Sequence, residues 1–545
     1  MSLACSQFVP GMLSFLVLMT VVKEIHSHVR PGEFPSVEEH FSDVMRSDGI
    51  NIRWERHVNS RTKVEHLNLT NSHMIEADIF LLEDSDGRMV PAPAYPGEKQ
   101  ERLDLRTWLV SVGQTNKGIR LNLLKTNVIR PAISQVYASK RHLKGPVWIH
   151  GDIVPGPNHK LQVLPAIDAE EFVSQFLKSW VPILDHYSPT LSVGWSSSYH
   201  PTRPDQETRY TWRHVLDILQ WTYEDVHDIN FVVRAIFVRE SLVPLLWLFS
   251  IRPDYKITIE FNESDMVSDF SGLATFRRLT DKSRVFYDMP EAHLADFLDA
   301  YHSAPTVPLE PIAWNRHDWS VEQDQPSAIE LSTVILGDRA VAFVGRDPIA
   351  FLRSKSTYSP TDNRMVISPD QAEAKSQHVI SGRVLFVPNS QIDSYFPRTE
   401  SALAIYLLPA AIMKDFAKNP LRGTRDGIEI YLGQDGIVYI KDGPQNNGQK
   451  TSKQIGRHEC YEFTVTDSYS HISLEVRASN RCTGSTDQVP ARNWHGKIDL
   501  LISSGVNGTR GPTYVALQKV GQRTQTADLI VEQLTSSTQT QPQGL

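Results

Sequence analysis

Segments with the pattern of buried strands alternate with segments of helical pattern from residue 51 to residue 301, eight times in succession. Two neighbouring parallel strands need a long crossover between them, usually a helix, so this alternation predicts a parallel sheet. Eight such units predict that the sheet closes into a barrel. The alternative is an open doubly wound sheet, which normally carries a glycine-rich phosphate loop after an early strand, and none is present. We therefore predict a (β/α)8 TIM-like barrel over residues 50–302.

The bounds of these units follow from apolar runs, helical periodicity and capping residues. The predicted strands are 51–58, 74–82, 118–124, 147–154, 191–196, 230–238, 255–261 and 284–289. The predicted helices are 61–69, 103–112, 128–141, 168–184, 211–226, 241–249, 265–278 and 291–301.

The pattern changes after the barrel. Residues 303–327 are irregular and contain several prolines, which is typical of a linker. In residues 328–533 the apolar period becomes mostly two, with turn signals such as Asp435-Gly436, and this predicts an all-β sandwich-like domain. The Ser/Thr/Gln-rich tail, residues 534–545, is predicted to be disordered. Residues 28–49 read as a polar N-terminal segment ahead of the barrel.

The N-terminus indicates the compartment. Residues 11–22 form an apolar run that is short for a membrane span and fits the core of a signal peptide over residues 1–27, with an uncleaved anchor as the alternative. The net charge of −8 and the absence of a long basic run argue against nucleic acid as the main partner. We expect a secreted, extracellular protein that contacts membrane only through a partner or through that anchor.

Three cysteines fit this reading. Cys5 would leave with the signal peptide, so Cys460 and Cys482 would form a disulfide, and two separate buried thiols are the alternative. Glycosylation sequons agree with secretion. They begin at Asn68, Asn262 and Asn507.

Two carboxylates interrupt the apolar strand 74–82. Glu76 and Asp78 are two residues apart, so both point to the same face of the strand. Buried charge is costly unless it is paired or bound to a metal. The pair is either satisfied by Arg, Lys or backbone groups, or it forms a site for a hard cation. If it binds no metal, Arg120 and Arg234 are the nearest partners by strand order.

Further polar side chains lie in or near the other strands, where barrel active sites are built. Each one alone could be a satisfied residue of the barrel core, but together they favour a site. They are His57, Asn122, Asp152, Trp195 and Arg234.

Six ordered motifs between residues 50 and 300 resemble the menorin family. They are His57–Ser60, Met74–Asp78, Lys117–Asn122, Pro155–Asn158, Leu191–Trp195 and Val233–Ala235. Menorin barrels are in turn similar to glycerophosphodiester phosphodiesterases and to sphingomyelinase D-type phospholipases. In those enzymes two His residues act in acid/base or nucleophilic roles, and a Glu-x-Asp pair with a third acid holds Mg²⁺ or Ca²⁺.

Carried over by position, the resemblance makes His57 the first catalytic His and makes Glu76 and Asp78 the metal pair. Two positions depart from the pattern: Tyr95 stands where the second His is expected, and Asn122 stands at the third acid. A Tyr, with a pKa near 10, is a poor replacement in acid/base catalysis for a His with a pKa near 6.5. We therefore expect vestigial catalytic residues and either no cofactor or a weakly bound Mg²⁺ or Ca²⁺.

Menorins are secreted or surface factors that act with cell-adhesion molecules in neurite and dendrite patterning. The resemblance therefore implies a non-catalytic recognition protein whose partner is the extracellular domain of an adhesion or receptor protein. One rival is a metal-dependent phosphodiesterase that uses His57 with His150 or His200. Another is a binder of lipid or sugar phosphates that uses Arg234 and Trp195 in the old pocket.

Overall fold

The computed structural model describes most of the chain after residue 33. The described residues are 34–94, 103–162, 164–180, 188–203, 205–223, 228–262, 265, 267–322, 333–345, 350–359, 376–388, 401–413, 427–443, 449–468, 471–482, 495–501, 512–520 and 527–540. The segment expected to be a signal peptide or anchor lies outside them. Within these residues no helix combines the length and apolar character needed to cross a bilayer.

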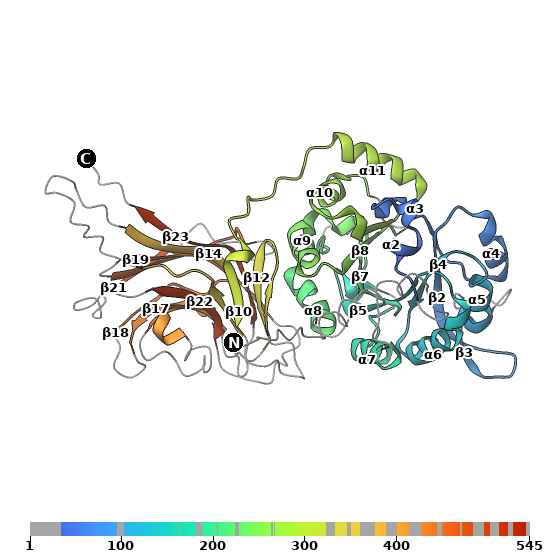
Figure 1. Ribbon diagram of the computed structural model, residues 1–545, viewed down its shortest axis with the longest axis horizontal. Coiled ribbons are helices and arrows are strands. Elements are labelled where there is room, and N and C mark those ends of the chain that lie inside the picture. The colour runs from blue at the N-terminus through green and yellow to red at the C-terminus, as the bar shows by residue number, and fades with distance from the viewer. Residues whose placement is uncertain are drawn as a thin grey trace, which may run out of the picture.

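The N-terminal domain is a nearly closed parallel barrel, as predicted (Figure 1). Its strands pair in the order β1-β2-β4-β5-β6-β7-β8-β9, and the hairpin strand β3 (Met89–Pro93), which was not predicted, is added antiparallel to β2. They are β1 (Trp54–Glu55), β2 (Met74–Glu83), β4 (Gly118–Leu123), β5 (Val147–Pro155), β6 (Thr190–Ser196), β7 (Ile229–Arg234), β8 (Tyr255–Glu260) and β9 (Val285–Asp288).

A side chain bridges the open seam between the first and last strands. Within the described residues β1 and β9 share no ladder. Arg56, just after β1, donates from Nε to the Asp288 carboxylate at 2.6 Å and from a terminal nitrogen to the Asp288 carbonyl at 2.7 Å. The first strand, predicted over 51–58, is only two residues long, and the Arg56 guanidinium links its end to β9 in place of backbone pairing.

Helices surround the barrel. The prediction of one helix per strand is met, although the seventh begins at Ser271 rather than at residue 265. Helix α8 has a capping box in which the Thr211 hydroxyl accepts from the backbone N–H of His214. The helices are α4 (Arg61–His66), α5 (Leu105–Val112), α6 (Ile129–Ser139), α7 (Ala169–Trp180), α8 (Trp212–Thr222), α9 (Leu242–Ile251), α10 (Ser271–Leu279) and α11 (Glu291–Ser303).

The segment before the barrel is not merely polar. Two short helices, α2 (Val37–His40) and α3 (Ser42–Met45), place apolar side chains in one buried cluster with Trp148 and Phe286 of the barrel. The Lys256 ammonium on β8 reaches Glu38 at 3.0 Å. Since these contacts lie at the N-terminal ends of the strands, the segment closes the floor of the barrel and leaves the other end for a site.

The C-terminal domain is all-β, with two seven-stranded antiparallel sheets around one apolar core, as predicted. The first sheet is β10 (Trp319–Glu322), β13 (Phe351–Ser354), β22 (Thr513–Val520), β15 (Ala402–Pro409), β16 (Ile428–Gly433), β17 (Ile437–Asp442) and β18 (Gln449–Gln454). The second is β11 (Thr333–Leu336), β12 (Ala340–Val344), β23 (Ala527–Thr540), β14 (Ser376–Pro388), β19 (Cys460–Ser468), β20 (His471–Ala478) and β21 (His495–Leu501).

Two boundaries of this domain differ from the prediction. It begins with β10 at Trp319, inside the predicted linker 303–327. The tail predicted to be disordered from residue 534 is, up to Thr540, the second half of β23. That half pairs with residues 376–381 of β14, so backbone hydrogen bonds hold a polar segment that buries little apolar surface.

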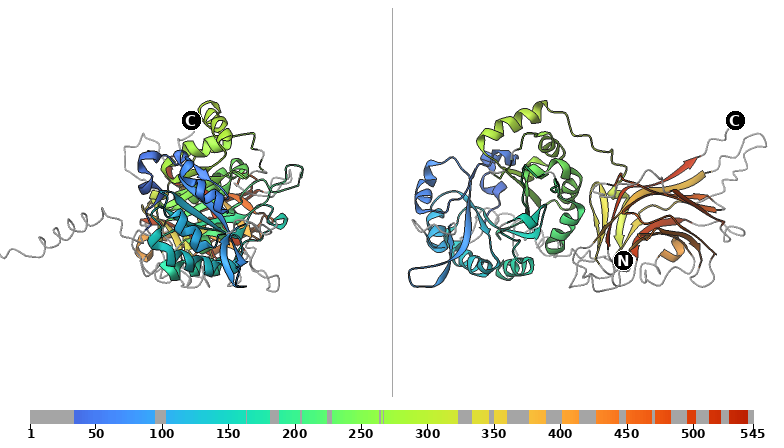
Figure 2. Two further views of the ribbon diagram at one scale, coloured as in Figure 1. Left: turned by 90° about the vertical axis from the view of Figure 1, so that its right-hand side faces the viewer. Right: turned by 180° about the vertical axis from the view of Figure 1, so that it is seen from behind.

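The two domains share a buried interface, and they lie side by side in Figure 1 and in the right-hand view of Figure 2. The indole of Trp247 on α9 donates to the Ala340 carbonyl on β12 at 2.9 Å and packs edge-on against Trp212 of α8 at 5.2 Å. One apolar cluster runs from the barrel helices into β12, β14 and β23. A Cβ on Gly337 would come within 2.3 Å of the Trp247 ring, so a larger residue there would push the domains apart.

A buried group of four charges lies at the same interface. Arg213 on α8 donates to Asp528 on β23 at 2.9 Å and to Asp217 at 2.8 Å. Lys519 on β22 donates to Asp528 at 3.1 Å. Burial would raise the pKa of Asp528, but Lys519 and Arg213 outweigh it and lower that pKa below its usual value. The two cations and two anions balance, so the interface combines apolar packing with matched charge.

The predicted disulfide between Cys460 and Cys482 is present. It joins the start of β19 to the residues after β20, so it closes one hairpin of the second sheet. Both cysteines are buried in the cluster that spans the domain interface.

Candidate functional site

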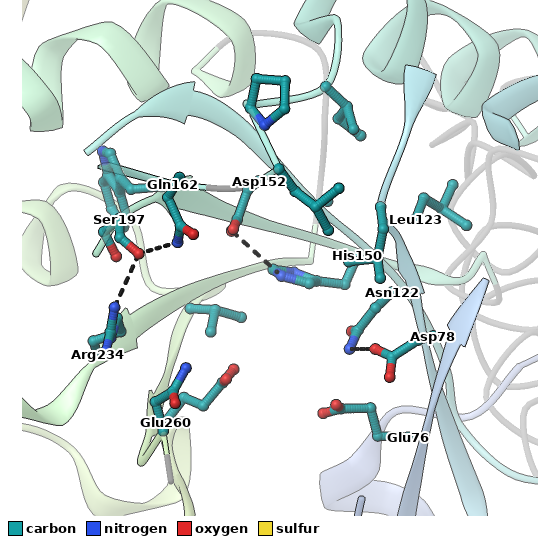
Figure 3. A pocket seen from close by; sticks show the side chains of 18 of the residues that line it. Glu76, Asp78, Asn122, Leu123, His150, Asp152, Gln162, Ser197, Arg234 and Glu260 are labelled. Atoms are coloured by element: carbon teal, nitrogen blue, oxygen red, sulfur yellow. Dashed lines mark hydrogen bonds and ion pairs between the residues drawn. The ribbon is translucent and has the colours of Figure 1, made fainter. Parts of the chain in front are cut away.

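The C-terminal ends of the barrel strands surround a cavity of about 210 Å³, shown from close by in Figure 3. Seven of the site residues named from the sequence line it together. They are His57, Glu76, Asp78, Asn122, Asp152, Trp195 and Arg234. His150 also lines the cavity, whereas His200 is not among its lining residues, and Nε2 of His200 lies 3.2 Å from the Ser198 hydroxyl. Tyr95 lies outside the described residues.

The register of two strands brings the polar residues into pairs. In the parallel ladder between β2 and β4, Glu76 lies beside Arg120 and Asp78 lies beside Asn122. Successive residues of one strand point to opposite faces, so residues two apart share the interior of the barrel.

Asp78 is held by three side chains. His57 approaches one carboxylate oxygen with Nδ1 at 2.8 Å, Asn59 donates to the same oxygen at 3.2 Å, and Asn122 donates to the other oxygen at 3.0 Å. Burial would raise the pKa of Asp78, but these hydrogen bonds lower it below the usual value, so the group stays ionised. His57 has φ +53°, a left-handed conformation that is uncommon for a residue other than glycine.

Glu76 is held by Arg120. The Arg120 guanidinium is fully buried, donates to the Glu76 carboxylate, and lies 3.0 Å from Asp288 and 3.3 Å from Glu260. It also stacks over the Trp54 ring at 4.9 Å. Of the two arginines expected from strand order, Arg120 is therefore the partner of Glu76.

Two acids of this network were not singled out in the sequence. Glu260 ends β8 and Asp288 ends β9, each after an apolar run, which is the same signal that drew attention to β2. Burial would raise the pKa of Glu260, but Arg120 and Arg56 lower it below its usual value. The network therefore contains three carboxylates and two guanidinium groups near one end of the barrel.

The donor set fits a tightly held Mg²⁺ or Ca²⁺ poorly. One atom each of His57, Glu76 and Asp78 lie within 4.8 Å of one another, which is the arrangement of a candidate metal site. However, hard cations take six or more oxygen ligands, and here Nδ1 of His57 faces Asp78 while Asn122 turns an N–H toward the same acid. The Arg120 guanidinium would also repel a bound cation. Two unit positive charges about 4 Å apart repel each other by about 4 kcal/mol at an effective dielectric constant near 20.

The far wall of the cavity is built around Arg234. Its guanidinium bonds to both oxygens of Asp265 and donates to the Ser197 carbonyl at 2.9 Å. Burial raises the pKa of Asp265 even though Arg234 opposes the rise. The Trp195 indole donates to the His214 carbonyl at 2.9 Å. Both residues are thus engaged by the protein itself, so an anion would have to compete with Asp265 for Arg234.

His150 lies between the two walls. Its Nδ1 is 3.1 Å from the Ser192 hydroxyl, and its Nε2 is 3.6 Å from Asp152, whose side chain is 44% exposed. The separation from Asp152 exceeds ordinary hydrogen-bond length. His150 therefore has a structural partner on β6 and a loosely held acid at the mouth.

Two of the three sequons can be placed. Asn68 is exposed beside α4, and Asn262 is exposed and lines the mouth of the cavity. Asn507 lies outside the described residues.

Comparisons with known proteins agree with the two-domain division. The Menorin N-terminal domain matches residues 48–294, and the Menorin C-terminal domain matches residues 319–536. Protein FAM151B of Homo sapiens is 33% identical over 274 residues, which is 50% of this chain and 95% of that protein.

Among solved structures, the similarity is confined to part of the chain and is weak. Lectin II from Ulex europaeus has 9% identity and a TM-score of 0.28, and covers 41% of this chain and 92% of its own. Alginate lyase AlyA1 from Zobellia galactanivorans has 11% identity and a TM-score of 0.22. The match covers 40% of this chain and 84% of the lyase. At these scores the similarity supports no conclusion about fold or ligand.

Proposed function

The chain belongs to the menorin family, and we propose that it is a non-catalytic extracellular recognition protein. Its partners in this proposal are the ectodomains of cell-adhesion or receptor proteins, and its role is in neurite and dendrite patterning. The disulfide supports an oxidising compartment, since such bonds are rare in the cytosol.

The observation that carries the proposal is the Arg120–Glu76 pair. A phosphodiesterase of this barrel type would use Glu76 and Asp78 as metal ligands. Here Arg120 donates to the first acid, and three side chains hold the second. The carboxylates that would face a cation are therefore satisfied within the protein, and a cation would have to displace these partners.

The rival hydrolase lacks support from the other residues too. Phosphodiester cleavage by this route needs two groups that transfer protons or attack phosphorus. His57 is paired with Asp78, and His150 has Ser192 as a partner. A glycan on Asn262 would also narrow access, because that residue lines the mouth. Mass spectrometry of the secreted protein should find Asn262 modified, and an unmodified peptide would remove this part of the argument.

The first test is hydrolysis of glycerophosphodiesters and lysophospholipids with Mg²⁺. We expect no turnover above the buffer blank for the wild type or for His57→Ala. Turnover that disappears in His57→Ala would refute the proposal and favour the enzyme.

The second test is binding to a panel of adhesion-protein and receptor ectodomains by surface plasmon resonance. We expect at least one ectodomain to bind, with equal affinity for wild type and His57→Ala, because His57 is not used for turnover. If no ectodomain of the panel binds the glycosylated full chain, the recognition role loses its support.

The third test asks whether Arg120 keeps cations out. In the double variant Arg120→Gln with Asn122→Asp, Glu76 is released from the guanidinium and a third carboxylate is added. We expect millimolar Ca²⁺ to raise the unfolding midpoint of this variant, since a ligand that binds only the folded state stabilises it. Asn122→Asp alone, which keeps Arg120, is the matched control and should gain little. An equal Ca²⁺ shift in the wild type would show that the acids are available to metal.

A further inference from the structure

A second cavity, of about 350 Å³, lies on the β domain, away from the barrel mouth. Its walls come from the end of the linker with the start of β10, the turn after β13, and the second half of β23. The lining residues are Ala313, Asn315, Asp318, Trp319, Ser354, Ser356, Thr357, Tyr358, His378, Leu534, Thr535, Ser536, Ser537 and Thr538. We call this cavity the hydroxyl cleft.

Half of these lining residues carry a hydroxyl group on Ser or Thr, and none is Lys or Arg. Hydroxyl groups both donate and accept hydrogen bonds. The one carboxylate, Asp318, is exposed, and the described part of the chain contains no ion pair that involves it. The hydroxyls of Ser354, Thr535, Ser536 and Thr538 already form hydrogen bonds within the protein. The cleft therefore offers a ligand the hydroxyls of Ser356, Thr357 and Ser537 and the Asp318 carboxylate, and its lining contains no Lys or Arg that could pair with an anion.

Rigid planar groups complete the walls. The rings of Tyr358 and His378 stack at 3.7 Å with an angle of 4° between them, and Trp319 stacks on Trp314 at 5.9 Å. The His378 ring lies 3.1 Å from the Thr538 hydroxyl and 2.8 Å from the Ser536 hydroxyl. Burial lowers the pKa of His378 to about 4, so the ring is neutral at pH 7 and adds no positive charge to the wall.

We propose that the hydroxyl cleft binds an uncharged saccharide unit. A sugar presents hydroxyl groups around its edge and C–H groups on its faces, and the cleft presents hydroxyl, amide and carboxylate groups beside aromatic rings. Its volume falls in the range of small-ligand pockets, about 300–1,000 Å³. Sulfated and phosphorylated sugars are disfavoured because they would meet Asp318 without a cation to pair with.

This inference does not depend on the barrel. An extended peptide is the competing occupant, and it would pair with residues 535–540 of β23, which among the described residues form a ladder with β14 only. A compact cavity lined mainly by side-chain hydroxyls favours a small polyol over a strand, which would need a long row of backbone groups.

The experiment uses the full chain on a glycan array that contains neutral and sulfated oligosaccharides. Calorimetry with the best neutral oligosaccharide follows. We expect binding to neutral probes only. Asp318→Ala should weaken it at least about tenfold, the loss expected for a hydrogen bond to a charged group. Asp86→Ala, an exposed acid on the β2–β3 hairpin, is the matched control and should bind as the wild type does.

A second variant, Thr357→Val, removes an exposed hydroxyl from the cleft with little change in volume and should also weaken binding. The proposal fails if no neutral glycan binds at millimolar concentration. It also fails if sulfated probes bind more tightly, or if both cleft variants bind the sugar as the wild type does. Capture of a strand-forming peptide that Asp318→Ala leaves intact, without sugar binding, would assign the cleft to the competing occupant.

Discussion

Arg120 is the single residue on which the candidate site most depends. It is fully buried and contacts three carboxylates, on β2, β8 and β9. Breaking a buried ion pair by removing one partner typically costs about 3–5 kcal/mol, because the other charge is left buried and uncompensated. We expect Arg120→Met to lower the free energy of unfolding by that amount in urea denaturation.

Arg53→Met is the control, because Arg53 is exposed near the start of β1, and it should change the stability little. If Arg120→Met were as stable as the wild type, the acids would have to be satisfied without the guanidinium. That result would reopen the metal-site reading.

At the residue scale, the sequence predicted where the two acids lie but not which group partners them. Spacing alone placed Glu76 and Asp78 on one face of a strand, and the structure confirms that both are buried in the barrel. It could not choose between a metal and a protein partner, because the choice depends on a neighbouring strand. The register that sets Glu76 beside Arg120 joins residues 44 positions apart. The long reach of Arg120 to β8 and β9 had no signal in the sequence.

At the scale of elements, the disulfide hairpin between β19 and β20 gives a prediction. The bond links residues 22 positions apart, and a loop of this length is stabilised by about 3 kcal/mol through restriction of the unfolded chain. Replacing Cys460 and Cys482 with Ala together should lower the denaturation midpoint accordingly. The wild type, denatured without reductant, should show no reactive thiol at these positions, and two reactive thiols there would contradict the pairing.

Several elements with a clear apolar pattern were predicted within about two residues, and polar ones were missed. The predicted strand 255–261 is Tyr255–Glu260, because Tyr255, Ile257 and Ile259 are buried in the barrel and give the strand its pattern. The strand predicted over 230–238 ends four residues early, at Arg234, because the apolar run continues into a 3₁₀ turn. The second half of β23 is exposed and polar, so its sequence shows no alternation, and only pairing with β14 makes it a strand. The floor helices α2 and α3 were missed because four-residue helices carry too little periodicity to detect.

At the scale of the whole molecule, the buried charges of the domain interface predict a dependence on pH. The folded-state pKa of Asp528 is lowered by Lys519 and Arg213, despite burial, relative to about 3.9 in an unfolded chain. Its contribution to stability is therefore fully present above pH 4–5 and is lost as the pH falls toward the folded-state pKa. Calorimetry between pH 7 and pH 3 should show a smaller loss of stability for Asp528→Asn than for the wild type. An identical pH profile for the two proteins would contradict this role, and Asp86→Asn is the control for a surface acid.

The same interface predicts that the two domains unfold together. Trp247 is fully buried and packs against Gly337, where a Cβ would lie within 2.3 Å of the ring. We expect the wild type to show one calorimetric transition and Gly337→Val to show two, as the barrel and the β domain separate. Asp86→Ala, at an exposed acid on the β2–β3 hairpin, is the control. A single transition of unchanged width in Gly337→Val would mean that the interface does not couple the domains.

The contact between Trp247 and β12 also affects how the two domains could bind one partner at the same time. A barrel and a β domain joined by a tether could reorient freely, and two bound ligands could then adopt many mutual distances. Here shared apolar packing and paired charges fix the barrel mouth and the hydroxyl cleft in one orientation. A partner that contacts both regions must therefore present its two contact points at one fixed separation. Geometry would then contribute to the selection of partners.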